Sequence, residues 1–117
     1  DQTDPTAPVS SAGVLLSSDR GATWRAKGVL TDARTSLLEA SIVEVGQHRP
    51  PRLETYFRTS TGCAFRAGSR DGGASWQPAE PMNLPNPNTK FHVLRLSLGG
   101  GMPGGDTLAL VYNNHKR

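Results

Sequence analysis

The sequence has little of three features that would point directly to a function. Cys63 is its only cysteine, which excludes an internal disulfide. No apolar run approaches the roughly 18 residues needed for a membrane-spanning helix. Aromatic residues are 6% of the chain and the net charge is +3. Because arginine clusters interleaved with exposed aromatic residues are missing, a nucleic-acid partner is not expected.

Turn-forming residues, by contrast, are abundant. The 117 residues include 13 glycines and 9 prolines. No helical periodicity of useful length appears, and short apolar runs alternate with polar, glycine- or proline-containing segments. This pattern predicts an all-β fold with a modest core.

Two stretches, 17–24 and 69–76, share the pattern S-x-D-x-G-x-[ST]-W. The matching residues lie 52 positions apart and are Ser17 and Ser69, Asp19 and Asp71, Gly21 and Gly73, and Trp24 and Trp76. A repeat of this period indicates architecture. Glycine permits a tight turn, the carboxylate and hydroxyl accept hydrogen bonds from turn N–H groups, and the indole ring anchors the turn. We therefore expect these residues to be structural rather than catalytic.

The two repeats resemble the Asp-box, or bacterial neuraminidase repeat, of sialidases and related β-propellers. The resemblance implies antiparallel four-stranded blades in a six-bladed propeller, with each box on the rim away from the active site. Propellers have roughly four to eight blades, and the spacing of the repeats gives this chain about two. We therefore expect a partial propeller whose partner is the remaining blades of a parent chain, or another chain that completes it.

The expected organisation follows from the positions of the repeats. Residues 1–12 are predicted to be a flexible leader and residues 13–117 a partial propeller. The propeller part divides into the end of one blade (13–30), a complete blade (37–82) and the start of the next (91–117). The strands are expected at 13–16, 25–30, 37–45, 53–60, 63–68, 77–82, 91–96 and 107–113.

Glu39 is the most informative carboxylate, because it lies in the apolar run LLEASIV, where an unpaired charge is costly. It is either a strand-end glutamate that faces water or an arginine, or a functional carboxylate at the mouth of a propeller channel. The segment 37–76 resembles the sialidase pattern of a glutamate-bearing inner strand, a turn, a strand that ends in arginine, and a box. The resemblance implies that Glu39 assists a nucleophilic tyrosine and that Arg58 binds the substrate carboxylate.

The end of the chain resembles the BNR repeat-like branch, in which a basic residue after a Tyr-Asn step faces the channel. Arg117 is thus a candidate for a second anion contact; the alternative is a solvated basic tail. The sequence also departs from the sialidase pattern. The first clamp arginine and the acid/base aspartate belong upstream of Glu39, and neither Tyr56 nor Tyr112 matches the position of the nucleophilic tyrosine.

Function follows from the resemblance. We expect a fragment, itself inactive, of a sialidase-like exo-glycosidase that removes sialic acid or a related acidic sugar from glycoconjugates. The alternatives are a non-catalytic propeller that binds glycans or proteins, and another carbohydrate-active enzyme on the same scaffold. No cofactor is expected, and the three histidines are too dispersed to indicate a metal site. A secreted or luminal location is favoured by the resemblance. Uncovered sheet edges predict self-association of the isolated chain.

Overall fold

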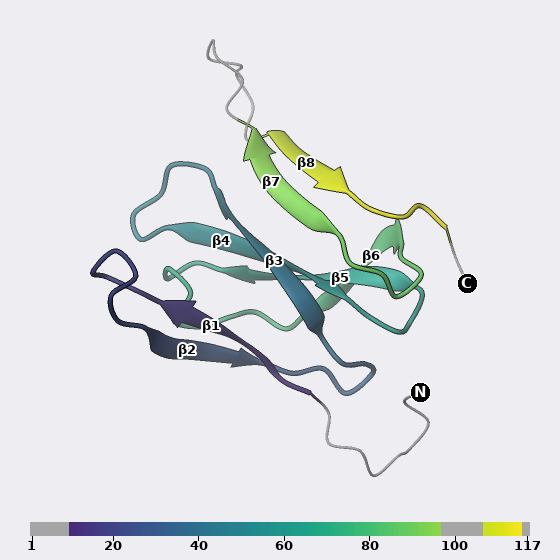
Figure 1. Ribbon diagram of the computed structural model, residues 1–117, viewed down its shortest axis with the longest axis horizontal. Helices are drawn as coiled ribbons and strands as arrows, with labels where there is room; N and C mark the ends of the chain where they lie inside the picture. The colour runs from purple at the N-terminus through teal and green to yellow at the C-terminus, as the bar shows by residue number, and fades with distance from the viewer. Residues whose placement is uncertain (1–9, 97–106, 116–117) are drawn as a thin grey trace.

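The computed structural model describes residues 10–96 and 107–115, which form eight β-strands and no helix. The strands are β1 (Ala12–Leu16), β2 (Arg25–Leu30), β3 (Leu38–Val45), β4 (Arg52–Arg58), β5 (Cys63–Ser69), β6 (Glu80–Pro85), β7 (His92–Leu96) and β8 (Thr107–Val111). They make three antiparallel sheets, in the orders β1–β2, β3–β4–β5–β6 and β7–β8. The sheets follow one another from the bottom to the top of Figure 1. The predicted all-β class is confirmed.

The central sheet is buried on both faces because it lies between the other two. In β4, Phe57 on one face is 1% exposed and Tyr56 on the other is 5% exposed. The cluster facing β1–β2 contains the buried residues Leu30, Leu37, Phe57, Phe65, Ala67 and Ala79. The cluster facing β7–β8 contains Val43, Tyr56, Ala64, Phe91 and Val93. Alternating side chains of one sheet thus join three sheets into one body. Among the described residues no helix is long and apolar enough to cross a membrane.

The outer strand of the central sheet lies further along the chain than the predicted 77–82. Gln77 donates its N–H to the carbonyl oxygen of Gly68 at 2.9 Å, but Pro78 has no N–H and interrupts the ladder. Regular pairing therefore begins at Glu80, where β6 starts. β6 tolerates prolines because it is an edge strand.

Ser41 fastens β3 to β7, the first strand of the next sheet. Its hydroxyl oxygen accepts the N–H of Val93 at 3.0 Å, and the hydroxyl lies 3.2 Å from the carbonyl oxygen of Val93, to which it donates. Ser41 is 6% exposed and Val93 is 2% exposed. A single buried hydroxyl therefore satisfies backbone groups of the neighbouring sheet.

Replacing Ser41 with alanine should lower the free energy of unfolding by about 1–3 kcal/mol, because the buried N–H of Val93 loses its acceptor. Urea denaturation measures the change. Ser60→Ala is the matched control, since Ser60 is exposed and its bond to Thr35 is 3.3 Å long. Equal losses in the two variants would contradict the role of Ser41 as a fastener.

Candidate functional site

Glu39 occupies an irregularity near the start of β3. The pairing of β3 with β4 shifts register between Leu38 and Ser41. Within that shift Glu39 has a φ of 45°, a conformation that is uncommon for a residue with a side chain. Such backbone strain persists only where the surroundings hold it, and it is often found at functional sites.

This irregularity brings Glu39 to Arg58, the last residue of β4. Leu38 is the register partner of Arg58, and the guanidinium Nη1 lies 3.3 Å from Oε2 of Glu39. The side chains are 25% exposed for Arg58 and 40% exposed for Glu39. The buried Nε of Arg58 has no hydrogen-bond partner among the described residues. The two main sequence candidates therefore form one partly exposed ion pair.

The other candidates lie elsewhere. Arg117 falls outside the described residues. The repeats occupy the β1–β2 and β5–β6 connections. Ser69 pairs with Leu53 near the beginning of β4, whereas Arg58 ends that strand. The second repeat is thus at the opposite end of the central sheet from the Glu39–Arg58 pair. Within residues 10–96 and 107–115, no group of three His, Cys, Asp or Glu side chains could hold a metal ion.

The second repeat closes its turn through two side chains. The hydroxyl of Ser69 donates to Oδ1 of Asp71 at 2.8 Å and accepts the N–H of Gly73 at 2.9 Å. Asp71 accepts the N–H of Ser75 at 2.9 Å and also the hydroxyl of Ser75. The carboxylate therefore works within its own turn.

The first repeat has the same bonds. The hydroxyl of Ser17 donates to Oδ1 of Asp19 at 2.8 Å and accepts the N–H of Gly21 at 2.7 Å. Asp19 accepts the N–H of Thr23 at 2.8 Å and the hydroxyl of Thr23 at 2.5 Å. The serine, aspartate, glycine and hydroxyl positions that the repeats share thus make the same hydrogen bonds in both turns.

These bonds predict acid sensitivity. Hydrogen bonds from the hydroxyls and N–H groups of Thr23 and Ser75 lower the pKa of Asp19 and of Asp71 to about 2. Because the folded-state pKa is below the unfolded value, their stabilisation is present above about pH 4 and is lost as the pH falls through about 2. We expect the melting temperature to drop between pH 4 and 2, and to drop less in an Asp19→Asn, Asp71→Asn double variant. An equal drop would contradict the assignment.

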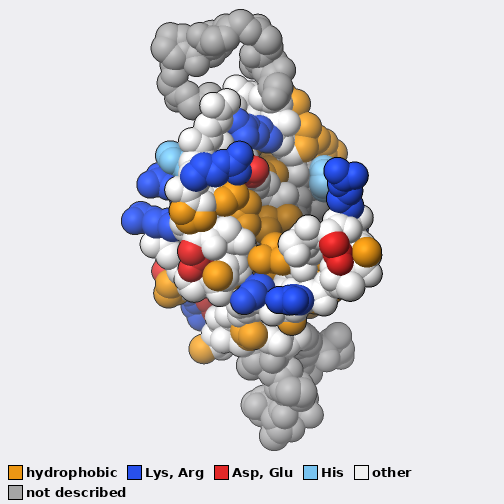
Figure 2. Space-filling view, turned by 90° about the vertical axis from the view of Figure 1, so that its left-hand side faces the viewer, with side chains coloured by type: hydrophobic (Ala, Val, Ile, Leu, Met, Phe, Trp, Pro, Cys, Tyr) orange, Lys and Arg blue, Asp and Glu red, His pale blue; other side chains and the backbone are white. Residues whose placement is uncertain are grey.

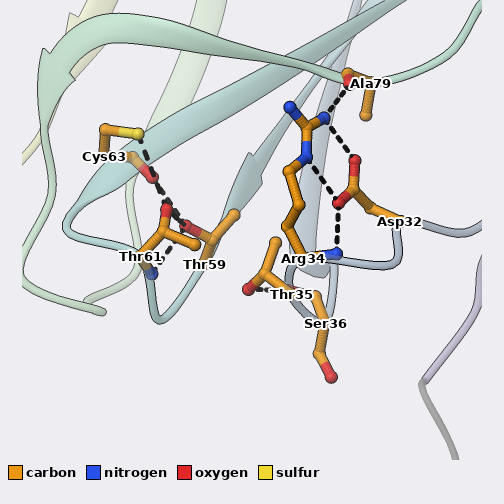
Figure 3. A network of polar contacts seen from close by, with 8 residues as sticks. All are labelled: Asp32, Arg34, Thr35, Ser36, Thr59, Thr61, Cys63 and Ala79. Atoms are coloured by element: carbon orange, nitrogen blue, oxygen red, sulfur yellow. Dashed lines mark hydrogen bonds and ion pairs between the residues drawn. The ribbon is translucent and has the colours of Figure 1, made fainter.

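A second polar cluster, in the connector between β2 and β3, was not singled out from the sequence. Arg34 holds both carboxylate oxygens of Asp32, with Nε at 2.9 Å and Nη2 at 2.6 Å (Figure 3). Nη2 also donates to the carbonyl oxygen of Ala79 at 2.9 Å, and the guanidinium lies 4.9 Å from the ring centre of Phe65. The hydrogen bond from Arg34 lowers the pKa of Asp32. The contacts of Arg34 are therefore structural. The sequence feature that could have indicated this ion pair is the Asp-x-Arg spacing of Asp32 and Arg34.

Tyr56 also belongs to a polar cluster. Its hydroxyl donates to Oε2 of Glu54, and Nη1 of Arg66 lies 3.8 Å from Oε1 of Glu54. Burial, and secondly the bond to Glu54, raises the pKa of Tyr56. Because Tyr56 is only 5% exposed, its hydroxyl is poorly placed to reach a substrate as a nucleophile. The sequence signal for this cluster was the spacing of Glu54 and Tyr56, two residues apart on one strand face.

Comparisons with known proteins bear on this arrangement. A family model described as a BNR repeat-like domain matches residues 7–117. A solved structure of a protein of unknown function from Dyadobacter fermentans is similar, with a TM-score of 0.60 and 30% sequence identity. The similarity covers 70% of this chain and 22% of the other, so this chain spans a small part of that protein's length. The search of curated proteins gave no match.

Proposed function

Because the chain belongs to the BNR repeat-like domain family, we propose that it is part of a sialidase-like propeller enzyme that removes a terminal acidic sugar from glycans. The observation that carries the proposal is the strained Glu39 beside Arg58. It places a carboxylate and a partly exposed guanidinium at the end of the central sheet opposite the second repeat.

In this proposal the three sheets are the end of one blade, a complete blade and the beginning of the next. The strand orders support the division, since β3–β4–β5–β6 is a four-stranded antiparallel sheet in chain order. The blades correspond to residues 13–30, 37–82 and 91–117, preceded by a leader. The rest of the propeller, with six blades in all, would come from a longer parent chain.

Arg58 would bind the sugar carboxylate. A guanidinium group presents parallel N–H donors that match the two oxygens of a carboxylate. Glu39 now occupies one donor, while the buried Nε has no partner among the described residues. A substrate carboxylate would therefore share or displace the contact that Glu39 makes with Nη1 of Arg58.

Glu39 would assist the nucleophile. In sialidases a tyrosine, rather than a carboxylate, forms the glycosyl intermediate. The free pKa of tyrosine is near 10, so a tyrosine nucleophile needs a base, and a nearby carboxylate can accept its proton. Tyr56 is buried and bonded to Glu54, so the tyrosine would come from another part of the parent, together with the acid/base aspartate. Arg117 would be a second anion contact.

The test uses the full-length parent and a sialoside that releases a fluorescent aglycone. Arg58→Ala should lower kcat/KM by roughly 10- to 100-fold, the loss expected for one charged hydrogen-bonding partner. Glu39→Gln, which keeps the shape but removes the charge, should lower kcat more than it raises KM. Arg66→Ala is the matched control, because Arg66 pairs with Glu54 in the same sheet but is outside the proposed site.

Two outcomes separate this proposal from its alternatives. If Glu39→Gln and Arg58→Ala leave a measured activity unchanged, the site assignment is wrong. A parent without a suitably placed tyrosine and without activity on any sialoside would overturn the enzyme proposal. Glycan binding retained in such a parent would favour the non-catalytic alternative.

A further inference from the structure

The end of the central sheet opposite Glu39 and Arg58 holds a cavity of about 190 Å³. The lining comes from the end of β3, the beginning of β4, the end of β5 and the β5–β6 connection, and consists of Val45, Arg52, Leu53, Glu54, Gly68, Ser69, Arg70 and Gln77. None of these residues belongs to the two-stranded sheets. The walls of the cavity are therefore supplied by the four-stranded sheet alone.

A backbone contact holds together the two turns beside this cavity. The N–H of Gly72, in the second repeat, donates to the carbonyl oxygen of Pro51, in the β3–β4 turn, at 3.0 Å. Arg52 directly follows Pro51 in the chain, and Arg70 lies shortly before Gly72. The contact therefore fixes the two backbone segments that carry Arg52 and Arg70, so that both arginines border the same cavity.

The two arginines bring positive charge that is free to meet a ligand. Arg52 and Arg70 are both exposed, and neither guanidinium group forms a hydrogen bond or an ion pair with another described residue. Figure 2 faces the end of the molecule that carries the β3–β4 turn, and more Lys and Arg than Asp and Glu side chains are visible there. Because guanidinium groups present parallel N–H donors that match the two oxygens of a carboxylate, the pair is suited to an anionic group.

Glu54 and Gln77 narrow the class of anion that fits. Glu54 lines the same cavity, so the two lining arginines and one lining glutamate leave one net positive charge. This charge matches a monoanion better than a phosphate monoester, which carries about −1.5 to −2 at pH 7. The carboxylate of Glu54 accepts hydrogen bonds from hydroxyl groups, and the carboxamide of Gln77 both donates and accepts them. The cavity therefore combines a place for one carboxylate with partners for neighbouring hydroxyls.

We propose that the cavity between Arg52 and Arg70 is a second, non-catalytic site that binds the carboxylate of an acidic sugar. The two guanidinium groups bind the carboxylate, and Glu54 and Gln77 bind the sugar hydroxyls. Arg52 and Arg58 are the first and last residues of β4, so a rise of about 3.3 Å per residue places their backbones about 20 Å apart. The site is therefore separate from the proposed hydrolytic site and does not rest on hydrolysis. It adds a second contact for an extended acidic glycan, which strengthens binding without a change at the first site.

Binding is measured on the full-length parent carrying Arg58→Ala, so that the proposed hydrolytic site does not contribute. The parent also contains the strands that complete the neighbouring sheets, so binding there shows that the cavity remains open. Glucuronate is the probe, with glucose as its neutral analogue and glucose 6-phosphate as its dianionic analogue. In protein with isotope-labelled arginine, glucuronate should shift the Nε–Hε NMR signals of Arg52 and Arg70 saturably, and glucose should not. Glucose 6-phosphate should bind more weakly than glucuronate.

Substitutions in the same background identify the residues that bind the probe. Arg52→Gln and Arg70→Gln should each raise the Kd for glucuronate roughly 10- to 100-fold, the loss expected for one charged hydrogen-bonding partner. Arg49→Gln is the matched control, because Arg49 is an exposed arginine of the β3–β4 turn that lines a different cavity. It should leave the Kd unchanged. Glu54→Gln removes the negative charge and should let glucose 6-phosphate bind at least as tightly as glucuronate.

Three results would overturn the proposal. The first is the absence of a saturable shift at Arg52 and Arg70 in the parent. The second is an equal loss of affinity in Arg49→Gln, which would indicate a diffuse basic surface instead of a site. The third is tighter binding of glucose 6-phosphate than of glucuronate before Glu54 is replaced. Sialoside hydrolysis is measured separately on the parent with Arg58 intact, so either proposal can fail without the other.

Discussion

Trp76→Ala is expected to lower the free energy of unfolding by about 3 kcal/mol, whereas Trp24→Ala should lower it by less than about 1 kcal/mol. The two tryptophans occupy the same position in the two repeats, but their surroundings differ. Trp76 packs on the core cluster facing β1–β2 and lies directly against Gly28 of β2. Trp24 is 59% exposed, and its Nε1 donates to the carbonyl oxygen of Gly21 at 3.0 Å within its own turn. The contribution of each tryptophan to the stability of the fold thus depends on its contact with a neighbouring sheet and not on the repeat itself.

Urea denaturation at one fixed protein concentration compares the variants, because self-association makes stability depend on concentration. Trp76→Phe supplies a further control. The buried Nε1 of Trp76 has no hydrogen-bond partner among the described residues, so phenylalanine removes an unsatisfied donor and keeps most of the apolar contact. Its loss should be clearly smaller than that of alanine. Equal losses of unfolding free energy in Trp24→Ala and Trp76→Ala would mean that the contact between Trp76 and β2 does not stabilise the fold.

Much of the fold could be predicted from the sequence, because strand formation depends on local alternation and on turn residues. The existence of all eight strands followed from short apolar runs separated by glycine, proline and polar segments. The two repeats located the β1–β2 and β5–β6 connections. The predicted start of β6 was wrong by three residues. Pro78 has no N–H and interrupts the pairing with β5, and the sequence alone does not show which N–H groups that pairing needs. Proline is tolerated within a strand at the edge of a sheet, and the sequence alone does not reveal which strands are edges.

The candidate site was predictable only in part. Glu39 stood out as a charge in an apolar run, but its contact with Arg58 depends on a register shift that periodicity does not reveal. The commitment of Arg34 to Asp32 was equally hidden, because it requires the connector to fold back over Phe65. Long-range register and loop conformation are set by packing between segments, and a single sequence carries little direct signal of it.

Gly28→Val should also destabilise strongly, by roughly 2–5 kcal/mol, for two separate reasons. Gly28 has a φ of +63°, which a β-branched residue adopts only with strain. In addition, a Cβ at this position would lie 2.6 Å from Cδ1 and 2.8 Å from Nε1 of Trp76. The ring cannot move away freely, because it is packed on the core cluster. The substitution therefore forces apart the sheets that Trp76 joins.

Gly62→Val measures the backbone strain alone, without a steric clash. Gly62 has a φ of +89°, yet a Cβ there would meet no atom within 4 Å. Gly62→Val should therefore lower the free energy of unfolding only by the cost of backbone strain, about 1–2 kcal/mol. In a Trp76→Ala background the clash with the ring disappears and only a 3.3 Å contact with the carbonyl oxygen of Gly73 remains, so Gly28→Val should cost only slightly more than Gly62→Val does. Equal losses at the two glycines in the original chain would mean that Trp76 does not pack against β2. A full loss at Gly28 in the Trp76→Ala background would mean that backbone strain alone decides this position.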